Sequence, residues 1–517
     1  MSVDNIKLYK ALKRYNDNIL KYYKDTSLSD DEYFLYAINY DITSNALNIL
    51  TNIFMDNLES SGVDLSCRCI LEAFIILKMN ESGAISEEQK KIFKQIYANV
   101  DYDNFNTLAS HLPDNHPLKK YLESISIDRQ EVIGNCLTHF GCERKDLFRV
   151  SIDDPCIYLK TNKDEDTRFV TLIAKYPPRN EYDYRIYNSL SLFIHPRCDM
   201  NQNALNEIFS VRNMYVDEIL VLVWKHLESK GLLDFEEESV SDFDYDFIHN
   251  PVLKNNLSNI NQTKQMFDYL QEAICNISEN ETDIFTLQFL KRIKLQVVDM
   301  MLSLSLGYKE HTIACYKSFI EEFSVFHAIE SFPTHKEREY LKKAYWITTK
   351  LQFKYLFDAS TDEENLKMRG EIDELYLNYY KARYELKSSS SLYENMKMND
   401  LHFLTKHKKS FNRFVKTLNE DANGYDEDLF YDARSVYSFS KDLSHASGYS
   451  FISSVEIVNL YAYKTLFHTF NFLVFFVKNS SIALNKKNAH RNLRVFYDFF
   501  KSMRQIYSKQ VERLINK

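Results

Sequence analysis

Residues 184–197 have the sequence YRIYNSLSLFIHPR, and residues 431–448 have the sequence YDARSVYSFSKDLSHASG. In each stretch a tyrosine stands eight positions before a histidine, which is His195 in the first and His445 in the second. Both histidines stand where a helix is expected to end, because one precedes a proline and the other precedes Ala-Ser-Gly. The two stretches therefore predict two helices of the same kind, far apart in the chain.

A second pair of segments repeats at almost the same offset. RCILEAF, which starts at Arg68, resembles KSFIEEF, which starts at Lys317, so a base, a glutamate and an aromatic residue recur at identical spacing. The glutamates, Glu72 and Glu321, precede the histidine of their own half by 123 and 124 positions. Two matches at nearly one offset indicate an internal duplication.

The composition predicts a helical protein. The chain has 517 residues but only 9 Gly and 8 Pro, whereas β-rich and Rossmann-type folds need glycine at turns and phosphate loops. We therefore expect a mainly α fold, built as a tandem duplication of a helical bundle. Apolar periodicity predicts long helices over residues 201–228, 284–306, 308–329 and 484–517, and Asp64 is predicted to cap a helix over 65–79.

Residues 149–176 break the helical pattern. Two short, β-branched runs, CIYL at 156–159 and FVTLIA at 169–174, flank a polar turn. We expect a small β-hairpin inserted in the first repeat.

An acidic segment, residues 232–263, loses apolar periodicity and is predicted to be a linker. It divides the chain into helical repeat 1 over residues 1–231 and helical repeat 2 over residues 264–517, with a basic C-terminal helix.

Charge, apolar runs and cysteines indicate a soluble, cytoplasmic protein. A net charge of −9 excludes a uniformly basic nucleic-acid binder, although a local basic face remains compatible with it. The longest apolar block, residues 470–477, is far shorter than the roughly 20 residues of a membrane span. Eight irregularly spaced cysteines are typical of reduced thiols.

The glutamate and histidine of each half are candidates for acid–base chemistry. Arg68 and Glu72 share one helix face, as do Ser191 and His195. If these helices pack together, a carboxylate could orient an imidazole beside a hydroxyl. The alternative is a buried polar network that fixes the register of the helices. Packing of the two copies about a pseudo-twofold axis would bring both sets into one central cleft.

These short motifs resemble a family of bacterial all-helical proteins related to the HEPN-like folds of abortive-infection and phage-defence systems. The resemblance covers about 30 residues in each half. It implies a helical bundle that dimerises and, in the HEPN case, metal-independent RNA cleavage by an arginine and a histidine. The residues it implies are His195 and His445 as acid–base groups, Arg185 and Arg434 as phosphate contacts, and Glu72 and Glu321 as orienting groups.

The arginine spacing departs from the HEPN pattern. HEPN ribonucleases place four to six residues between the arginine and the histidine of one helix. Here Arg185 precedes His195 by ten positions and Arg434 precedes His445 by eleven.

Metal and cofactor sites are not predicted. Cys136, His139 and Cys142 have residue types that bind zinc, but they lack the tighter Cys-x-x-Cys spacing of structural sites, and buried thiols are the favoured interpretation. Walker, Gly-x-Gly-x-x-Gly, Gly-x-Ser-x-Gly and His-Glu-x-x-His motifs are absent from the sequence.

Two basic stretches are candidates for nucleic-acid contacts, because cationic side chains bind phosphates and aromatic rings stack on bases. Their alternative role is a solvated helix face. The candidate residues are Lys406, Lys408, Lys409, Arg413, Arg491 and Arg494.

Two functions of different classes are compatible with these patterns. The first is a sensor, effector or interaction protein of a bacterial defence system, which binds a protein or nucleic acid between the two repeats. The second is a divergent HEPN-like, metal-independent ribonuclease. The candidate partners are RNA, a protein ligand and a second copy of the chain.

Overall fold

A computed structural model describes part of the chain. The described residues are 4–21, 28–54, 57–81, 112–124, 176–194, 202–233, 283–330, 435–440, 455–479 and 486–515, with short pieces at 87, 105, 108–110, 134, 138, 173–174, 335, 338–339, 342 and 443–444.

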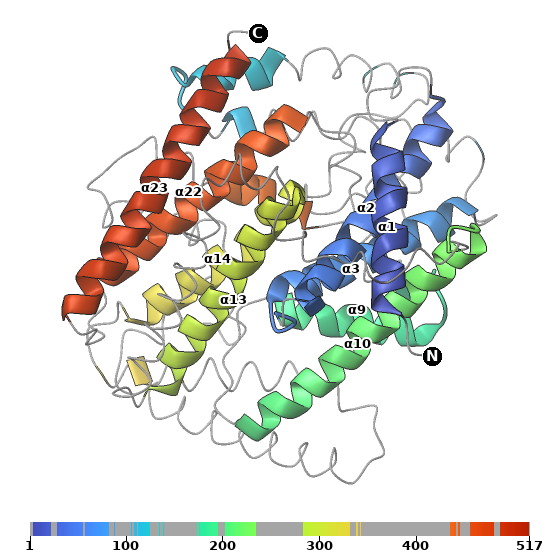
Figure 1. The fold of residues 1–517 in the computed structure, drawn as a ribbon, viewed down its shortest axis with the longest axis horizontal. Coiled ribbons are helices and arrows are strands. Elements are labelled where there is room, and N and C mark those ends of the chain that lie inside the picture. The colour runs from blue at the N-terminus through green and yellow to red at the C-terminus, as the bar shows by residue number, and fades with distance from the viewer. Residues whose placement is uncertain are drawn as a thin grey trace.

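The described helices form two groups that lie side by side (Figure 1). The N-terminal group consists of α1 (Asn5–Lys21), α2 (Asp30–Phe54), α3 (Ser61–Glu81), α9 (Glu181–Ile194) and α10 (Gln202–Ser229). The C-terminal group consists of α13 (Ile284–Leu306), α14 (Lys309–Glu330), α22 (Val455–Asn479) and α23 (Lys486–Ile515). None of the described residues lies in a strand, so the mainly α prediction is confirmed.

Caps and a glycine explain why α13 and α14 form a tight helical hairpin. The Asp283 side chain accepts a hydrogen bond from the backbone N–H of Phe285 and caps the start of α13. Gly307 ends the helix in the left-handed region, at φ 88°, where a residue without Cβ is favoured. The chain then turns back at once, and the Thr312 hydroxyl donates to the Met300 carbonyl at 3.2 Å. The helices predicted over 284–306 and 308–329 are confirmed within one residue.

The start of α3 differs from the prediction that Asp64 is its cap. The helix begins at Ser61, and the Ser60 hydroxyl accepts a hydrogen bond from the backbone N–H of Gly62 at 3.1 Å. Asp64 lies inside the first turn, completely buried, where it pairs with Arg212 of α10. The prediction was wrong because a serine nearer the N-terminus caps the helix, which frees the aspartate for a buried ion pair.

Each group has its own apolar core, and the central helices of the two groups pack on each other. In the N-terminal group α3 packs against α2, α9 and α10, and in the C-terminal group α14 packs against α13 and α22. Helices α3 and α14 also contact one another, so they form the junction between the groups.

Each core also contains residues that are close in sequence to the helices of the other group. A set of apolar residues that precedes α9 in sequence belongs to the core of the C-terminal group, beside the helices drawn in orange and red (Figure 1). The set contains Phe105, Leu108, Ala109, Leu112, Leu118 and Leu122. Conversely, Tyr308, directly before α14, lies in the core of the N-terminal group.

The predicted β-hairpin is not supported where it is described. Of residues 149–176, the structure describes only 173, 174 and 176, and Ile173 and Ala174 have helical backbone. Ile173 is completely buried in the N-terminal core. A short β-branched run fits a buried helix as well as a strand, and the rest of the predicted hairpin lies outside the described residues.

The linker prediction lies almost entirely outside the described residues. Helix α10 ends in a turn at Gly231, with φ 67°, and only Leu232 and Leu233 of the segment 232–263 are described. The boundaries of the two predicted repeats therefore stay predictions.

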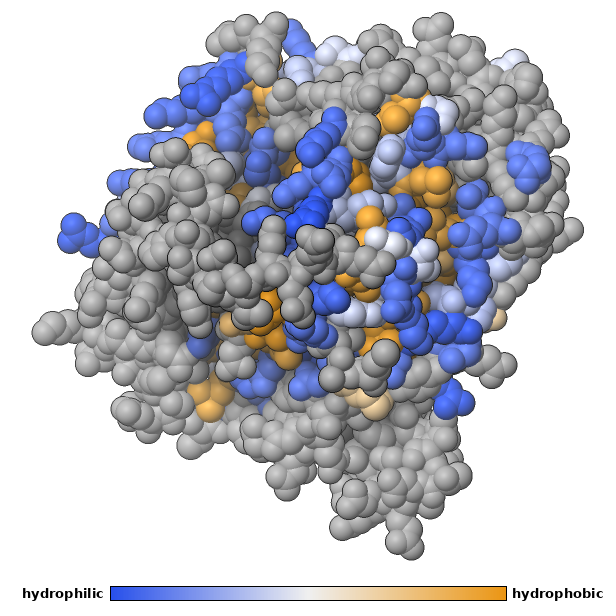
Figure 2. All heavy atoms as spheres, turned by 45° about the vertical axis from the view of Figure 1, so that its right-hand side comes forward, coloured by the Kyte–Doolittle hydropathy of each residue, from blue (hydrophilic) through white to orange (hydrophobic). Residues whose placement is uncertain are grey.

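Hydrophilic side chains cover much of the described surface on the face in Figure 2, with apolar side chains visible between them. Among the described helices, none is both long enough and apolar enough to cross a bilayer.

Candidate functional site

The first predicted glutamate, Glu72 of α3, is completely buried among polar partners. Its carboxylate accepts hydrogen bonds from Arg68 Nε at 2.9 Å and from the Tyr187 hydroxyl of α9 at 2.8 Å. The Arg68 guanidinium lies 5.4 Å from the centre of the Tyr187 ring. Burial and the neighbouring Glu72 raise the pKa of Tyr187 well above its usual value, although Arg68 opposes the shift.

The second predicted glutamate, Glu321 of α14, has the same kind of partner. It is 3 % exposed, and it accepts a hydrogen bond from the Tyr437 hydroxyl at 3.2 Å. The base at the matching position, Lys317, donates to the Ser444 hydroxyl at 3.4 Å. In both groups the repeated tyrosine therefore contacts the repeated glutamate.

The burial of both glutamates favours the polar-network alternative over acid–base chemistry. A general acid or base has to reach the proton that it transfers. The hydrogen bond between Glu72 and Tyr187 instead connects α3 to α9. Glu321 accepts a hydrogen bond from Tyr437, which follows α14 by more than a hundred positions in the sequence. Such satisfied networks fix the register of packed helices.

The predicted histidines lie outside the described residues, but the residues before them lie at the junction. The carbonyl of Ile194, directly before His195, accepts a hydrogen bond from the Ser318 hydroxyl of α14 at 3.0 Å. Ser444, directly before His445, contacts Lys317 of the same helix.

The two predicted phosphate-binding arginines are not brought together by described contacts. Arg185 is exposed on α9, and Arg434 lies outside the described residues. Their roles stay predictions.

The predicted nucleic-acid residues are described only on α23. Arg494 is exposed, Arg491 lies in the same helix, and Lys406, Lys408, Lys409 and Arg413 lie outside the described residues. The predicted zinc-type residues Cys136, His139 and Cys142 also lie outside them.

Helix α23 presents a basic face to solvent. Met503, Tyr507 and Leu514 are buried on its inner side, towards α22. Besides Arg494, the described exposed cations are Lys501, Arg504, Lys509 and Arg513, against the exposed acids Asp498 and Glu512. Tyr497 is 44 % exposed, and Lys501 Nζ lies 4.4 Å from the centre of its ring.

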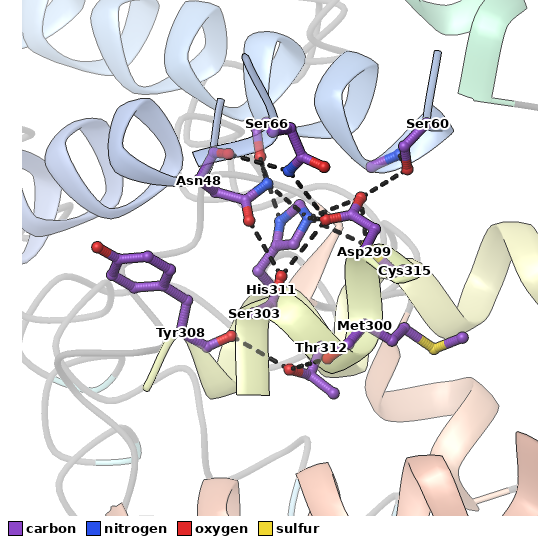
Figure 3. Close-up of polar contacts among 12 residues, drawn as sticks. Asn48, Ser60, Ser66, Asp299, Met300, Ser303, Tyr308, His311, Thr312 and Cys315 are labelled. Carbon is purple, nitrogen blue, oxygen red and sulfur yellow. Dashed lines mark hydrogen bonds and ion pairs between the residues drawn. The ribbon is translucent and has the colours of Figure 1, made fainter. Parts of the chain in front are cut away.

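A buried polar cluster that the sequence did not predict lies at the junction (Figure 3). We call it the junction cluster. Its members from α2, α3 and the turn between them are Asn48, Asn52, Ser60 and Ser66, and its members from α13 and α14 are Asp299, Ser303, His311 and Cys315. All eight side chains are buried.

His311 is at the centre of the junction cluster. Its Nε2 lies 2.8 Å from Asn48 Nδ2, 3.0 Å from Cys315 Sγ and 3.3 Å from Asp299 Oδ1. Its Nδ1 lies 3.1 Å from the Ser66 hydroxyl. In Figure 3, Asn48 and Ser66 of the N-terminal group and Asp299 of the C-terminal group lie around this ring.

Asp299 is held by donors from both groups. Its carboxylate accepts hydrogen bonds from the Ser60 hydroxyl at 2.6 Å and from Asn52 Nδ2 at 3.1 Å. Burial alone would raise the pKa of Asp299, but His311 and these donors lower it below its usual value. Burial and the nearby Asp299 raise the pKa of the Cys315 thiol well above its usual value.

The backbone of α3 comes so close to this cluster that only glycine fits. A Cβ at Gly62 would lie 1.8 Å from Asp299 Oδ2 and 2.6 Å from Cys315 Sγ. A small cavity of about 20 Å³, with room for about one water, adjoins the cluster at His311. His311 and Cys69 line it together with Tyr308, Glu310 and Leu443. Burial raises the pKa of Glu310 to about 7.

A buried ion pair fixes α10 to the start of α3. The Arg212 guanidinium contacts Asp64 through Nε at 2.5 Å and Nη2 at 2.9 Å, and both side chains are completely buried. Arg212 also donates to the carbonyls of Leu58 and Ser60. The pair therefore holds the turn that carries Ser60, and through it the junction cluster.

One pattern in the sequence could have revealed part of the junction cluster. His311 and Cys315 stand four positions apart and share one face of α14. Asp299 stands on the preceding helix of a hairpin with a very short turn, which brings the two helices together.

Comparisons of the chain with protein-family models, with curated proteins and with solved structures find no match. The function is therefore argued from the described residues.

Proposed function

We propose that this chain is a helical effector or sensor of a bacterial defence system that binds RNA through the exposed face of α23. The defence context comes from the resemblance to HEPN-like proteins. The observation that carries the RNA proposal is the basic face, where five exposed cations stand against two exposed acids among the described side chains of α23, on a chain of net charge −9.

The chemistry of this face fits single-stranded RNA. Lysine and arginine neutralise phosphates, and an exposed aromatic ring such as Tyr497 offers a stacking surface for a base. The cavity beside His311 has room for about one water, so among the described residues the outer face of α23 is the better candidate for the contact.

We propose further that the two groups of helices are copies of one unit, related by an approximate twofold axis. The matched pairs Glu72–Tyr187 and Glu321–Tyr437 support this duplication. It is also supported across the junction. The offset that relates Arg68 to Lys317 also relates Ser66 to Cys315 and Gly62 to His311. Gly62 adjoins Cys315, and His311 contacts Ser66, so the two copies contact each other through matching positions.

The RNA proposal is tested by the salt dependence of binding. Fluorescence anisotropy of a labelled 20-nucleotide RNA is measured over a range of NaCl concentrations for the wild type and for Lys501→Gln/Lys509→Gln. If both lysines contact phosphates, the slope of log K against log salt becomes shallower by about 1.4. The control is Lys13→Gln/Lys21→Gln, which removes the same charge from the exposed side of α1 and should leave the slope unchanged. Equal slopes for the two variants would refute the proposal.

The second candidate is a metal-independent ribonuclease at the junction. It is favoured by one observation: the residues directly before His195 and His445 both contact α14. RNA integrity in cells that express the wild type or His195→Ala/His445→Ala tests it. Cut RNA that disappears in an equally stable variant would support the nuclease, whereas intact RNA with both proteins would exclude it.

A further inference from the structure

We propose that Asp299, His311 and Cys315 bind one Zn²⁺ ion inside the junction cluster. The observation is the convergence of three metal-binding atoms from two helices. His311 Nε2 lies 3.4 Å from Asp299 Oδ2 and 3.0 Å from Cys315 Sγ, and the carboxylate oxygen lies 3.6 Å from the sulfur. All three side chains are buried and lie within the distance that one ion can span.

These separations are close to those that zinc imposes. Tetrahedral zinc, with bonds of about 2.0 Å to nitrogen and oxygen and about 2.3 Å to sulfur, holds its ligand atoms about 3.3–3.6 Å apart. The two distances that involve the carboxylate agree with this range. The nitrogen–sulfur distance is shorter by about half an ångström, which a small rotation of the Cys315 side chain would correct.

The charges of the three groups also favour a divalent ion. A carboxylate and a thiolate carry two negative charges, and the imidazole that binds a metal is neutral, so Zn²⁺ makes the site neutral overall. Neutrality matters here because the three side chains are at most 6 % exposed, and an uncompensated buried charge is costly. The mixture of sulfur, nitrogen and oxygen ligands selects zinc over magnesium or calcium, which prefer oxygen alone.

The surrounding hydrogen bonds prepare the ligand atoms for a metal. In the metal-bound form the Nε2 lone pair binds the ion, so Asn48 Nδ2, which lies 2.8 Å from Nε2, gives up this contact. The Nδ1–H then donates to the Ser66 hydroxyl. Metal-binding histidines commonly use the second ring nitrogen in this way. Ser60 and Asn52 orient the carboxylate of Asp299.

The ion would fasten the junction. Asp299 comes from α13, whereas His311 and Cys315 come from α14, and their hydrogen-bonding partners come from α2, α3 and the turn between them. Zinc would thus hold the helical hairpin closed and fix the surface on which the N-terminal group packs. Three protein ligands leave the fourth position of the tetrahedron to a water, as in zinc sites of the catalytic type.

The test uses the full chain and Co²⁺ as a spectroscopic substitute for zinc. One equivalent of Co²⁺ should produce thiolate-to-metal charge-transfer absorption together with the d–d bands of a tetrahedral site, and Zn²⁺ should abolish both. Cys315→Ser should lose the charge-transfer band and lower zinc affinity at least about 100-fold, and Ser60→Ala should lower it about 10-fold. The matched control is Cys67→Ser, because Cys67 is an equally buried thiol on α3 that lies outside the cluster.

The zinc proposal does not depend on RNA binding, so either proposal can fail without affecting the other. Absence of the charge-transfer band in the folded wild type would overturn it, and so would an equal effect of Cys315→Ser and Cys67→Ser on zinc affinity. Should Cys315→Ser not fold, Asp299→Asn replaces it, since the amide is close in shape to the carboxylate but lacks its charge. An unchanged zinc affinity in Asp299→Asn would then overturn the proposal.

Discussion

Replacing Gly62 by alanine adds one methyl group at the tightest point of the junction. The new Cβ would lie 1.8 Å from Asp299 Oδ2 and 2.6 Å from Cys315 Sγ, so the carboxylate has to move by more than an ångström. That movement breaks the 2.6 Å hydrogen bond from Ser60.

The size of the effect follows from three contributions. Loss of a hydrogen bond to a charged group costs about 1.5–3 kcal/mol. Overpacking of a close-packed interior adds about 1–3 kcal/mol. The better helix propensity of alanine offsets at most about 1 kcal/mol. We therefore expect Gly62→Ala to lower the free energy of unfolding by about 1.5–6 kcal/mol.

Urea denaturation followed by circular dichroism, in the presence of a chelator, measures this change. The control is Gly134→Ala, because Gly134 has helical backbone and a Cβ there meets no atom within 4 Å. This control should be neutral or more stable by up to about 1 kcal/mol. If Gly62→Ala is as stable as Gly134→Ala, the close approach of α3 to the junction cluster is wrong.

Three further predictions concern named contacts outside that cluster. Tyr187→Phe should lower the free energy of unfolding by about 1.5–3 kcal/mol, because it removes a hydrogen-bond donor from the buried Glu72. Tyr437→Phe should lower it less, because its hydrogen bond to Glu321 is longer and the tyrosine is half-buried. The opposite order in urea denaturation would contradict this. Arg212→Ala should cost about 3–5 kcal/mol by leaving Asp64 buried without its guanidinium, and the double variant Asp64→Ala/Arg212→Ala should cost less than the sum of the single variants; additive costs would argue against the pair. Burial lowers the pKa of His226 from 6.5 to about 4, so between these pH values the unfolded chain holds a proton that the native state lacks. The stability of the wild type relative to His226→Gln should therefore fall by at most about 3 kcal/mol as the pH drops from 6.5 to 4. Parallel pH profiles of the two proteins would refute this assignment.

The sequence predicted helices best where local chemistry fixes their ends. Helix α13 begins at a capping aspartate and ends at a glycine with positive φ, and both are visible in the sequence. Helix α10 ends before Gly231 for the same reason. Where several residues can cap, as at Ser60 and Asp64, local chemistry does not decide, because the tertiary partner Arg212 selects one of them.

The candidate site was predicted only in part, because its contacts join distant residues. The repeated spacing drew attention to Glu72 and Tyr187, which contact one another, although the expected partner of the glutamate was the histidine. The junction cluster was missed. Its contacts join Asn52 to Asp299 and Ser66 to His311, 247 and 245 positions apart, and helical periodicity does not identify which faces of two distant helices meet.

The central claim, RNA binding by the basic face of α23, is tested most directly by photocrosslinking. A single-stranded RNA that contains 4-thiouridine is crosslinked to the full chain, and the modified peptides are identified by mass spectrometry. Our account predicts crosslinks in Lys486–Ile515, concentrated near Tyr497 and Lys501. Crosslinks confined to α1–α10, or none at an RNA concentration that saturates binding, would contradict it.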